Sequence, residues 1–87
     1  MAMLDMEKTT AMTWGGRALA SYHLSRESAT PVERLQRFCD GEGFRQEALE
    51  HASMCEDGGA LMHAIQHEIE AGRWPAIEAL RRVLEPR

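Results

Sequence analysis

Four side chains that bind metal ions in other proteins occur as two pairs near the middle of the chain. His51 and Cys55 are four residues apart, and His63 and His67 are also four residues apart. Residues at this spacing lie on one face of a helix, and three imidazoles with one thiolate form a tetrahedral zinc set. A helical hairpin that turns near Gly59 would bring the two pairs level with each other.

The helical phase of the second pair argues against this zinc site. The apolar residues of the same segment form a stripe, Leu61, Met62, Ile65 and Ile69. His63 and His67 point away from that stripe, toward the expected solvent face. We therefore predict no metal and no cofactor, and interpret the four residues as two exposed histidines, one histidine at the edge of the core and one buried thiol. Only a helix covered on both faces would restore the zinc site.

The other reactive residues form no recognisable catalytic arrangement. Cys39 lies at the expected turn, and Cys55 is about 11 residues, or about 16 Å of helix, beyond that turn. A disulfide needs α-carbons within about 7 Å. The glycine pairs at 15–16 and 58–59 lack the lysine and hydroxyl residue of a phosphate-binding loop. We therefore predict that the protein is not an enzyme.

Composition favours one small acidic domain. The chain has 87 residues, 44% hydrophobic residues and a formal net charge of −4. No basic stripe is present to meet nucleic-acid phosphates, and the acidic N-terminus lacks the basic start and apolar stretch of a signal peptide. These features predict a cytoplasmic protein that binds neither membranes nor nucleic acids.

Helix start and stop signals divide the second part of the chain into short segments. Thr30-Pro31-Val32-Glu33 combines an N-cap threonine, a first-turn proline and the glutamate of a capping box. Glycines at 41, 43, 58, 59 and 72 are typical of helix ends, and Pro75 of a helix start. The predicted fold is all-α, a small bundle of four short amphipathic helices at about 31–39, 44–56, 59–71 and 75–85.

The first part of the chain is harder to assign. We expect residues 1–29 to form a variable, partly helical arm or an extra helix beside a helical domain over residues 30–87, because Gly15-Gly16 and several serines weaken a helical pattern. This segment holds large apolar side chains without a clear place in the helical core. Tyrosine and tryptophan are frequent binding anchors. The predicted protein-binding residues are Met12, Trp14, Leu19 and Tyr22.

Elimination leaves binding as the expected activity. A small acidic helical protein without catalytic, phosphate-binding or membrane signatures is expected to act as a regulator, inhibitor or antagonist that binds a larger partner protein. The alternative is a small DNA-associated or metal-responsive transcriptional regulator, since residues 32–54 can be interpreted as a helix-turn-helix. Its recognition helix would carry Glu47 and Glu50 against Arg45, and phosphates repel that charge.

A homodimer is also predicted. Four short helices supply only narrow apolar stripes, and the chain has few aromatic residues to enlarge the hydrophobic core. Pairing of two copies would bury more apolar surface. The predicted dimer interface contains Phe38 and Phe44, which flank the expected turn at residues 40–43.

Overall fold

Three long helices, rather than four short ones, make up the fold. The computed structural model contains α1 (Ala2–Glu27), α2 (Pro31–Ser53) and α3 (Gly58–Leu84). The structure describes residues 2–55 and 57–85, and the side chains of these ranges from residue 6 onward. The prediction of an all-α fold is confirmed, whereas the prediction of four short helices is wrong.

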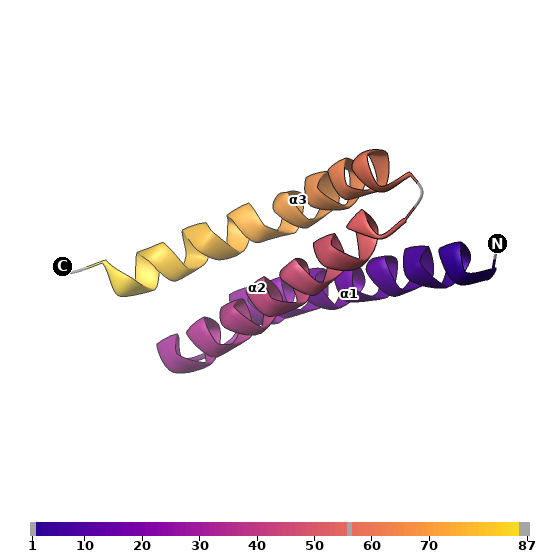
Figure 1. Cartoon of the computed structure of the whole chain (residues 1–87). Helices are drawn as coiled ribbons and strands as arrows, with labels where there is room; N and C mark the ends of the chain where they lie inside the picture. Colours follow the sequence, from indigo (N-terminus) through magenta and orange to yellow (C-terminus); the bar gives the residue numbers. More distant parts are fainter. Residues whose placement is uncertain (1, 56, 86–87) are drawn as a thin grey trace.

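The helices form an elongated antiparallel bundle. α2 returns along α1, and α3 then runs in the direction of α1 and ends beyond the α1–α2 turn (Figure 1). The molecule measures 54 × 17 × 14 Å along its principal axes. Within the described residues, no helix is long and apolar enough to cross a membrane.

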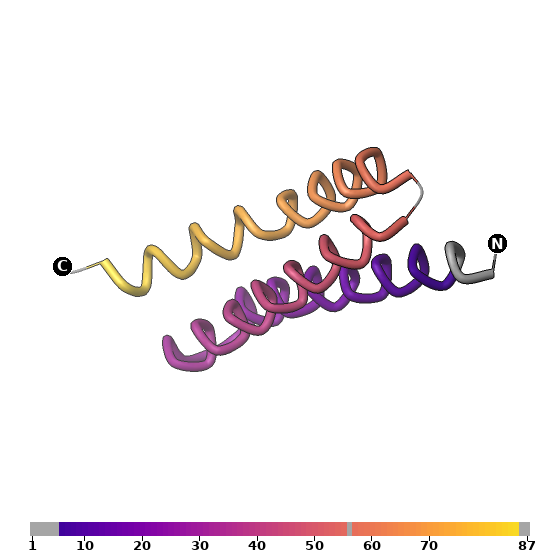
Figure 2. Tube along the Cα trace, viewed as in Figure 1, coloured from indigo at the N-terminus to yellow at the C-terminus, as the bar shows by residue number. Residues whose placement is uncertain are grey.

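The expected turn at residues 40–43 is absent, and the trace of α2 continues through it (Figure 2). Gly41 is buried against the ring of Tyr22, and a Cβ on Gly41 would lie 2.6 Å from Tyr22 Cε1. No glycine in the described part of the chain has a positive φ. Gly41 therefore allows two helices to approach closely and does not end a helix. Because residues 31–53 form one helix, the helix-turn-helix interpretation is wrong.

The expected break between residues 71 and 75 is absent for a similar reason. A Cβ on Gly72 would lie 2.6 Å from Leu19 Cδ2, so this glycine also makes room for a side chain of α1. Pro75 lies inside α3. Proline has no N–H to donate to the preceding turn, yet the helix continues past it. The two helices predicted at 59–71 and 75–85 are therefore one helix.

The predicted start at Thr30 is confirmed. Pro31 is the first residue of α2, and Thr30 Oγ1 accepts a hydrogen bond from the backbone N–H of Glu33 at 3.2 Å. Two further bonds fix the α1–α2 turn. Ser25 Oγ donates to the carbonyl of Arg34 at 2.7 Å, and Arg34 Nε donates to the carbonyl of Ser28 at 2.9 Å. These hydrogen bonds hold the short turn between α1 and α2 in place.

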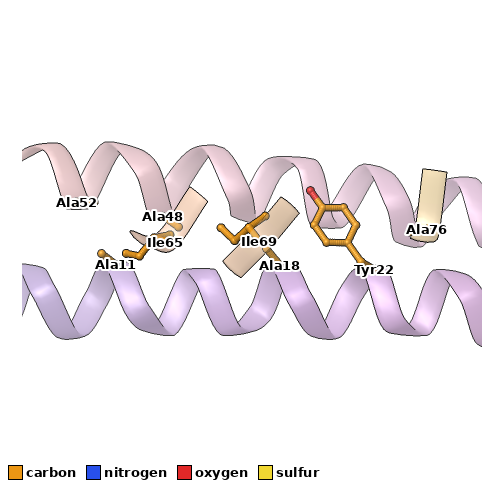
Figure 3. Packing of buried hydrophobic residues seen from close by; sticks show 8 residues of the cluster. All are labelled: Ala11, Ala18, Tyr22, Ala48, Ala52, Ile65, Ile69 and Ala76. Carbon is orange, nitrogen blue, oxygen red and sulfur yellow. The ribbon is translucent and has the colours of Figure 1, made fainter. Parts of the chain in front are cut away.

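Of the two alternatives for residues 1–29, the structure shows the extra helix. Met1 lies outside the described residues, as does Glu56, the predicted end of the second short helix. The side chains of α1 are integral to the core, which Figure 3 shows between the helices. The core cluster comprises Ala11, Ala18, Tyr22, Ala48, Ala52, Ile65, Ile69 and Ala76. Because most of these residues are alanines, the helix axes can lie close together.

Candidate functional site

The four residues considered for zinc do not come together. His51 faces α1, where its Nδ1 lies 2.8 Å from Glu7 Oε2. His63 and His67 are exposed on α3, and the Cys55 thiol donates to the carbonyl of His51 at 3.6 Å. Within the described residues, no three histidine, cysteine, aspartate or glutamate side chains are arranged to hold a metal ion.

A polar network joins all three helices. Tyr22 Oη donates to Glu42 Oε1 at 2.8 Å, and Arg73 Nε donates to the same oxygen at 2.6 Å. Glu70 extends the network, since its carboxylate lies 3.3 Å from Arg73 Nη1 and 3.2 Å from Arg45 Nε. Sequence reasoning missed this network, because its members lie on three different helices.

The charges of this network are mutually neutralised. Burial and the hydrogen bond to Glu42 raise the pKa of Tyr22 above its ordinary value, so the phenol keeps its proton and donates. Burial alone would raise the pKa of Glu42, but the hydrogen bonds from Arg73 and Tyr22 outweigh it and leave that pKa below its ordinary 4.5. The hydrogen bond to Glu42 raises the pKa of Arg73. These groups hold the helices in register, because each one is bonded to another member of the network.

The four predicted protein-binding residues fall on two sides of α1. Tyr22 is fully buried toward α2, and Trp14 stacks on Phe44 with ring centroids 5.6 Å apart. Figure 3 shows the Tyr22 ring pointing from α1 toward α2. Met12 and Leu19 instead line a groove between α1 and α3. Two of the four residues are thus structural, and two lie at an open surface.

The two predicted dimer residues also contact their own chain. The Phe44 ring stacks on the Trp14 ring, and the centre of the Phe38 ring lies 5.6 Å from the centre of the Tyr22 ring. The guanidinium of Arg73 lies 6.0 Å from the centre of the Phe38 ring. The turn that Phe38 and Phe44 were expected to flank does not exist, because α2 is continuous there.

An apolar groove of about 440 Å³ runs along the seam between α1 and α3. Its α1 wall consists of Lys8, Met12, Gly15, Gly16 and Leu19. Its α3 wall consists of Leu61, Ala64, Ile65, Glu68 and Ile69. We call this surface the α1–α3 groove. Only two of its ten residues are charged, and the groove is open to solvent rather than enclosed.

The glycine pair creates the hollow. A Cβ on Gly15 would make ordinary contact with Ile65 Cγ2 at 3.7 Å, whereas a Cβ on Gly16 would meet nothing within 4 Å. At the centre of the α1 wall, therefore, no side chain covers the backbone. Met12 stands beside it with 58% of its surface exposed. The glycines that made a helix here hard to predict are the residues that open its surface.

A second hollow of about 440 Å³ lies farther along the same pair of helices. It is lined by Arg26, Trp74, Pro75, Glu78, Ala79 and Arg82, and Trp74 is 57% exposed. We call it the Trp74 hollow. The contact of Leu19 with Gly72 lies between this hollow and the α1–α3 groove. Together the two hollows extend along most of the α1–α3 seam.

Comparisons with protein-family models, with curated proteins and with solved structures find no match to this chain. The function must therefore be argued from the residues and geometry of the chain itself.

Proposed function

We propose that this chain is a small non-enzymatic regulator that acts in the cytoplasm by binding a larger partner protein, with the α1–α3 groove as its binding surface. The observation that supports this proposal is the uncovered backbone at Gly16, which leaves an apolar hollow in the outer surface of the bundle. Concave apolar surfaces of this size are typical of binding sites.

The distribution of polar groups supports binding rather than catalysis. The groups with the most displaced pKa values, Tyr22, Glu42 and Arg73, are bound to one another in the inter-helix network. The groove carries charge only at Lys8 and Glu68. Both cysteines are free thiols, which is typical of a reducing compartment. Occupation of the groove would block or alter the partner's own contacts, as expected for a regulator or antagonist.

The groove can be filled without disturbing the core. In Gly16→Leu the new side chain enters open space, and leucine is a better helix former than glycine by about 0.8 kcal/mol. Gly43→Leu is the matched control, since Gly43 is an exposed glycine of α2 that also has nothing within 4 Å of its would-be Cβ. Gly43 lines a separate and more polar hollow between α2 and α3, so this variant fills a different surface. Circular dichroism and thermal melting should show that both variants fold at least as well as the natural chain.

Partner capture then tests the proposal. The natural chain and the two variants are used as baits in extracts of the native host, and the bound proteins are compared. We expect proteins captured by both the natural chain and Gly43→Leu to bind Gly16→Leu at least tenfold more weakly, a difference of about 1.4 kcal/mol. Equal capture by all three baits would show that the groove is not the binding surface.

A further inference from the structure

We propose that the occupant of the α1–α3 groove is an amphipathic helix of the partner that runs antiparallel to α1 and α3, with acidic residues along its α1 side and basic residues along its α3 side. This inference rests on the proposed function and specifies the chemistry of the partner. Its basis is the direction of the groove helices, the kind of surface they form and the charges along the two rims.

Direction follows from the order of the helices. α1 and α3 run the same way, and α2 runs against both (Figure 1). A helix placed antiparallel in the α1–α3 groove completes an up-down-up-down arrangement of four helices. The macrodipole of that helix then opposes those of both neighbours, which is the favourable arrangement.

The surface of the groove suits a helix better than a strand. Both walls are helices, whose backbone N–H and C=O groups are bonded within each helix, so the groove offers no free edge to which a strand could add. Apolar side chains spaced along one face of a docked helix would instead contact Met12, Ile65 and the backbone at Gly16. A helix in an apolar groove is a recurrent mode of recognition.

The two rims of the seam differ in charge. The α1 rim carries Lys8 in the groove and Arg26 in the Trp74 hollow, and the α3 rim carries Glu68 and Glu78 at the corresponding places. Within the described part of the chain, none of these four side chains makes an ion pair. Arg82 departs from this pattern at the far end of the α3 rim. A docked helix with an acidic edge toward α1 and a basic edge toward α3 complements both rims.

A second copy of the chain does not supply such a helix. The apolar stripes of α1 and α3 form the core and the groove walls. Among the side chains that the structure describes, the exposed large apolar residues of α2 are Val32 and Leu35 in its first turns, and Met54 follows its last residue. α2 therefore presents no continuous uncovered apolar face, and the uncovered apolar face of α1 and α3 is the groove itself. For this reason we assign the occupant to another protein.

The length of the seam defines the probe. Lys8 and Arg26 are 18 residues apart on one helix, a span of about 27 Å. The test uses two synthetic amphipathic helical peptides of matching length with blocked ends and identical apolar faces. The first peptide has glutamates on the edge that faces α1 and lysines on the edge that faces α3 when it lies antiparallel. The second peptide has these edges exchanged.

Fluorescence anisotropy at low salt measures both affinities. We expect the natural chain to bind the first peptide at least threefold more tightly than the second, with a ratio that falls as salt is added. The variant Lys8→Glu/Glu68→Lys exchanges the two charges of the groove without changing the net charge. This variant should reverse the preference. A nitroxide at the N-terminus of the first peptide should broaden amide signals near Arg26 rather than near Lys8 in nuclear magnetic resonance spectra.

The outcomes separate this inference from the proposed function. Equal affinity for both peptides, or broadening near Lys8, overturns the antiparallel charge-matched helix. If neither peptide binds but partner capture still depends on Gly16, the inference fails and the proposed function stands. If partner capture is also insensitive to Gly16→Leu, both fail. If the first peptide binds preferentially, Gly16→Leu must abolish that binding, because the inference requires the groove itself.

Discussion

The two seams that α1 makes with its neighbours are built from similar small residues and have opposite results. Toward α2, Ala11, Ala18 and Gly41 let the helices approach until Tyr22 is fully enclosed. Toward α3, Gly16 instead leaves an open hollow. A glycine closes a seam when a side chain of the opposite helix fills the space of its Cβ. It opens a seam when nothing does.

The polar groups follow the same division. The Tyr22, Glu42 and Arg73 side chains are bonded to one another across α1, α2 and α3. Lys8 and Glu68, at the edge of the α1–α3 groove, are exposed and make no ion pair within the described residues. The polar groups of this network are bonded to one another, whereas the edge of the α1–α3 groove presents charge to solvent. The first is suited to stability and the second to recognition.

The largest expected effect is a loss of stability when the contact between α1 and α2 is disrupted. Tyr22→Ala removes a fully buried ring and leaves a cavity, so the free energy of unfolding should fall by about 3–5 kcal/mol. Leu19→Ala removes a half-buried side chain from the open seam and should cost only about 1–2 kcal/mol. Urea unfolding followed by circular dichroism measures both. Equal losses would mean that the two seams contribute alike to stability.

A pair of alanine substitutions should separate the seams by the sign of the effect. In Gly41→Ala the added methyl lies 2.6 Å from the Tyr22 ring, and the resulting overpacking of about 1–3 kcal/mol exceeds the gain in helix propensity. In Gly16→Ala the methyl enters open space, so the protein should be stabilised by about 0.5–1 kcal/mol. Thermal melting compares the two variants. A stabilised Gly41→Ala would contradict the close approach of α1 and α2.

The polar network should give a pH dependence that the open seam lacks. Because the pKa of Glu42 is lowered in the folded state, its stabilising contribution is present above pH 4.5 and is lost as the pH falls through the folded pKa. The natural chain should therefore exceed Glu42→Gln in stability at neutral pH, and the difference should shrink in acid. Urea unfolding at several pH values measures it.

Glu50→Gln is the control for this pH series. It removes an exposed carboxylate from the same helix. We expect this variant to follow the pH dependence of the natural chain. A constant difference between the natural chain and Glu42→Gln from neutral to acid pH would show that the Glu42 charge does not stabilise the fold.

The smallest expected effect concerns self-association. The predicted homodimer through Phe38 and Phe44 lies on α2, so light scattering should give a dimer mass that Gly16→Leu leaves unchanged. Both rings already contact Tyr22, Arg73 or Trp14 of their own chain, which leaves less of their surface for a second copy. A monomer mass at the highest attainable concentration would remove the homodimer prediction.

Part of the core could be predicted from the sequence. Ile65 and Ile69 of the predicted apolar stripe are buried. Val32, Leu35 and Phe38 recur at three-residue steps in the sequence, which is also typical of a buried helix face, but Val32 and Leu35 are 66% and 44% exposed. They lie in the first turns of α2, where α3 does not cover them. Periodicity identifies an apolar face, but it does not show whether a neighbouring helix covers that face.

Two of the four predicted binding residues lie at the groove, and the other two were misassigned for a related reason. Met12 and Leu19 are seven residues apart, so they share a helix face once α1 is known to be a helix. Trp14 and Tyr22 then fall on another face, toward α2. Treating residues 1–29 as a variable segment removed that phase information and grouped the four residues together. A continuous helix assumed through Gly15-Gly16 would have separated them.

The sequence by itself determined the all-α class and the start of α2, because the Thr30 cap and Pro31 act through hydrogen bonds and backbone angles within a single turn. Tertiary structure alone decided that Gly41 and Gly72 continue helices, since the residues that fill their Cβ space, Tyr22 and Leu19, lie on another helix. It also decided that Gly16 opens a groove. Glycine has no side chain to indicate its role, so its effect depends on what the fold places beside it.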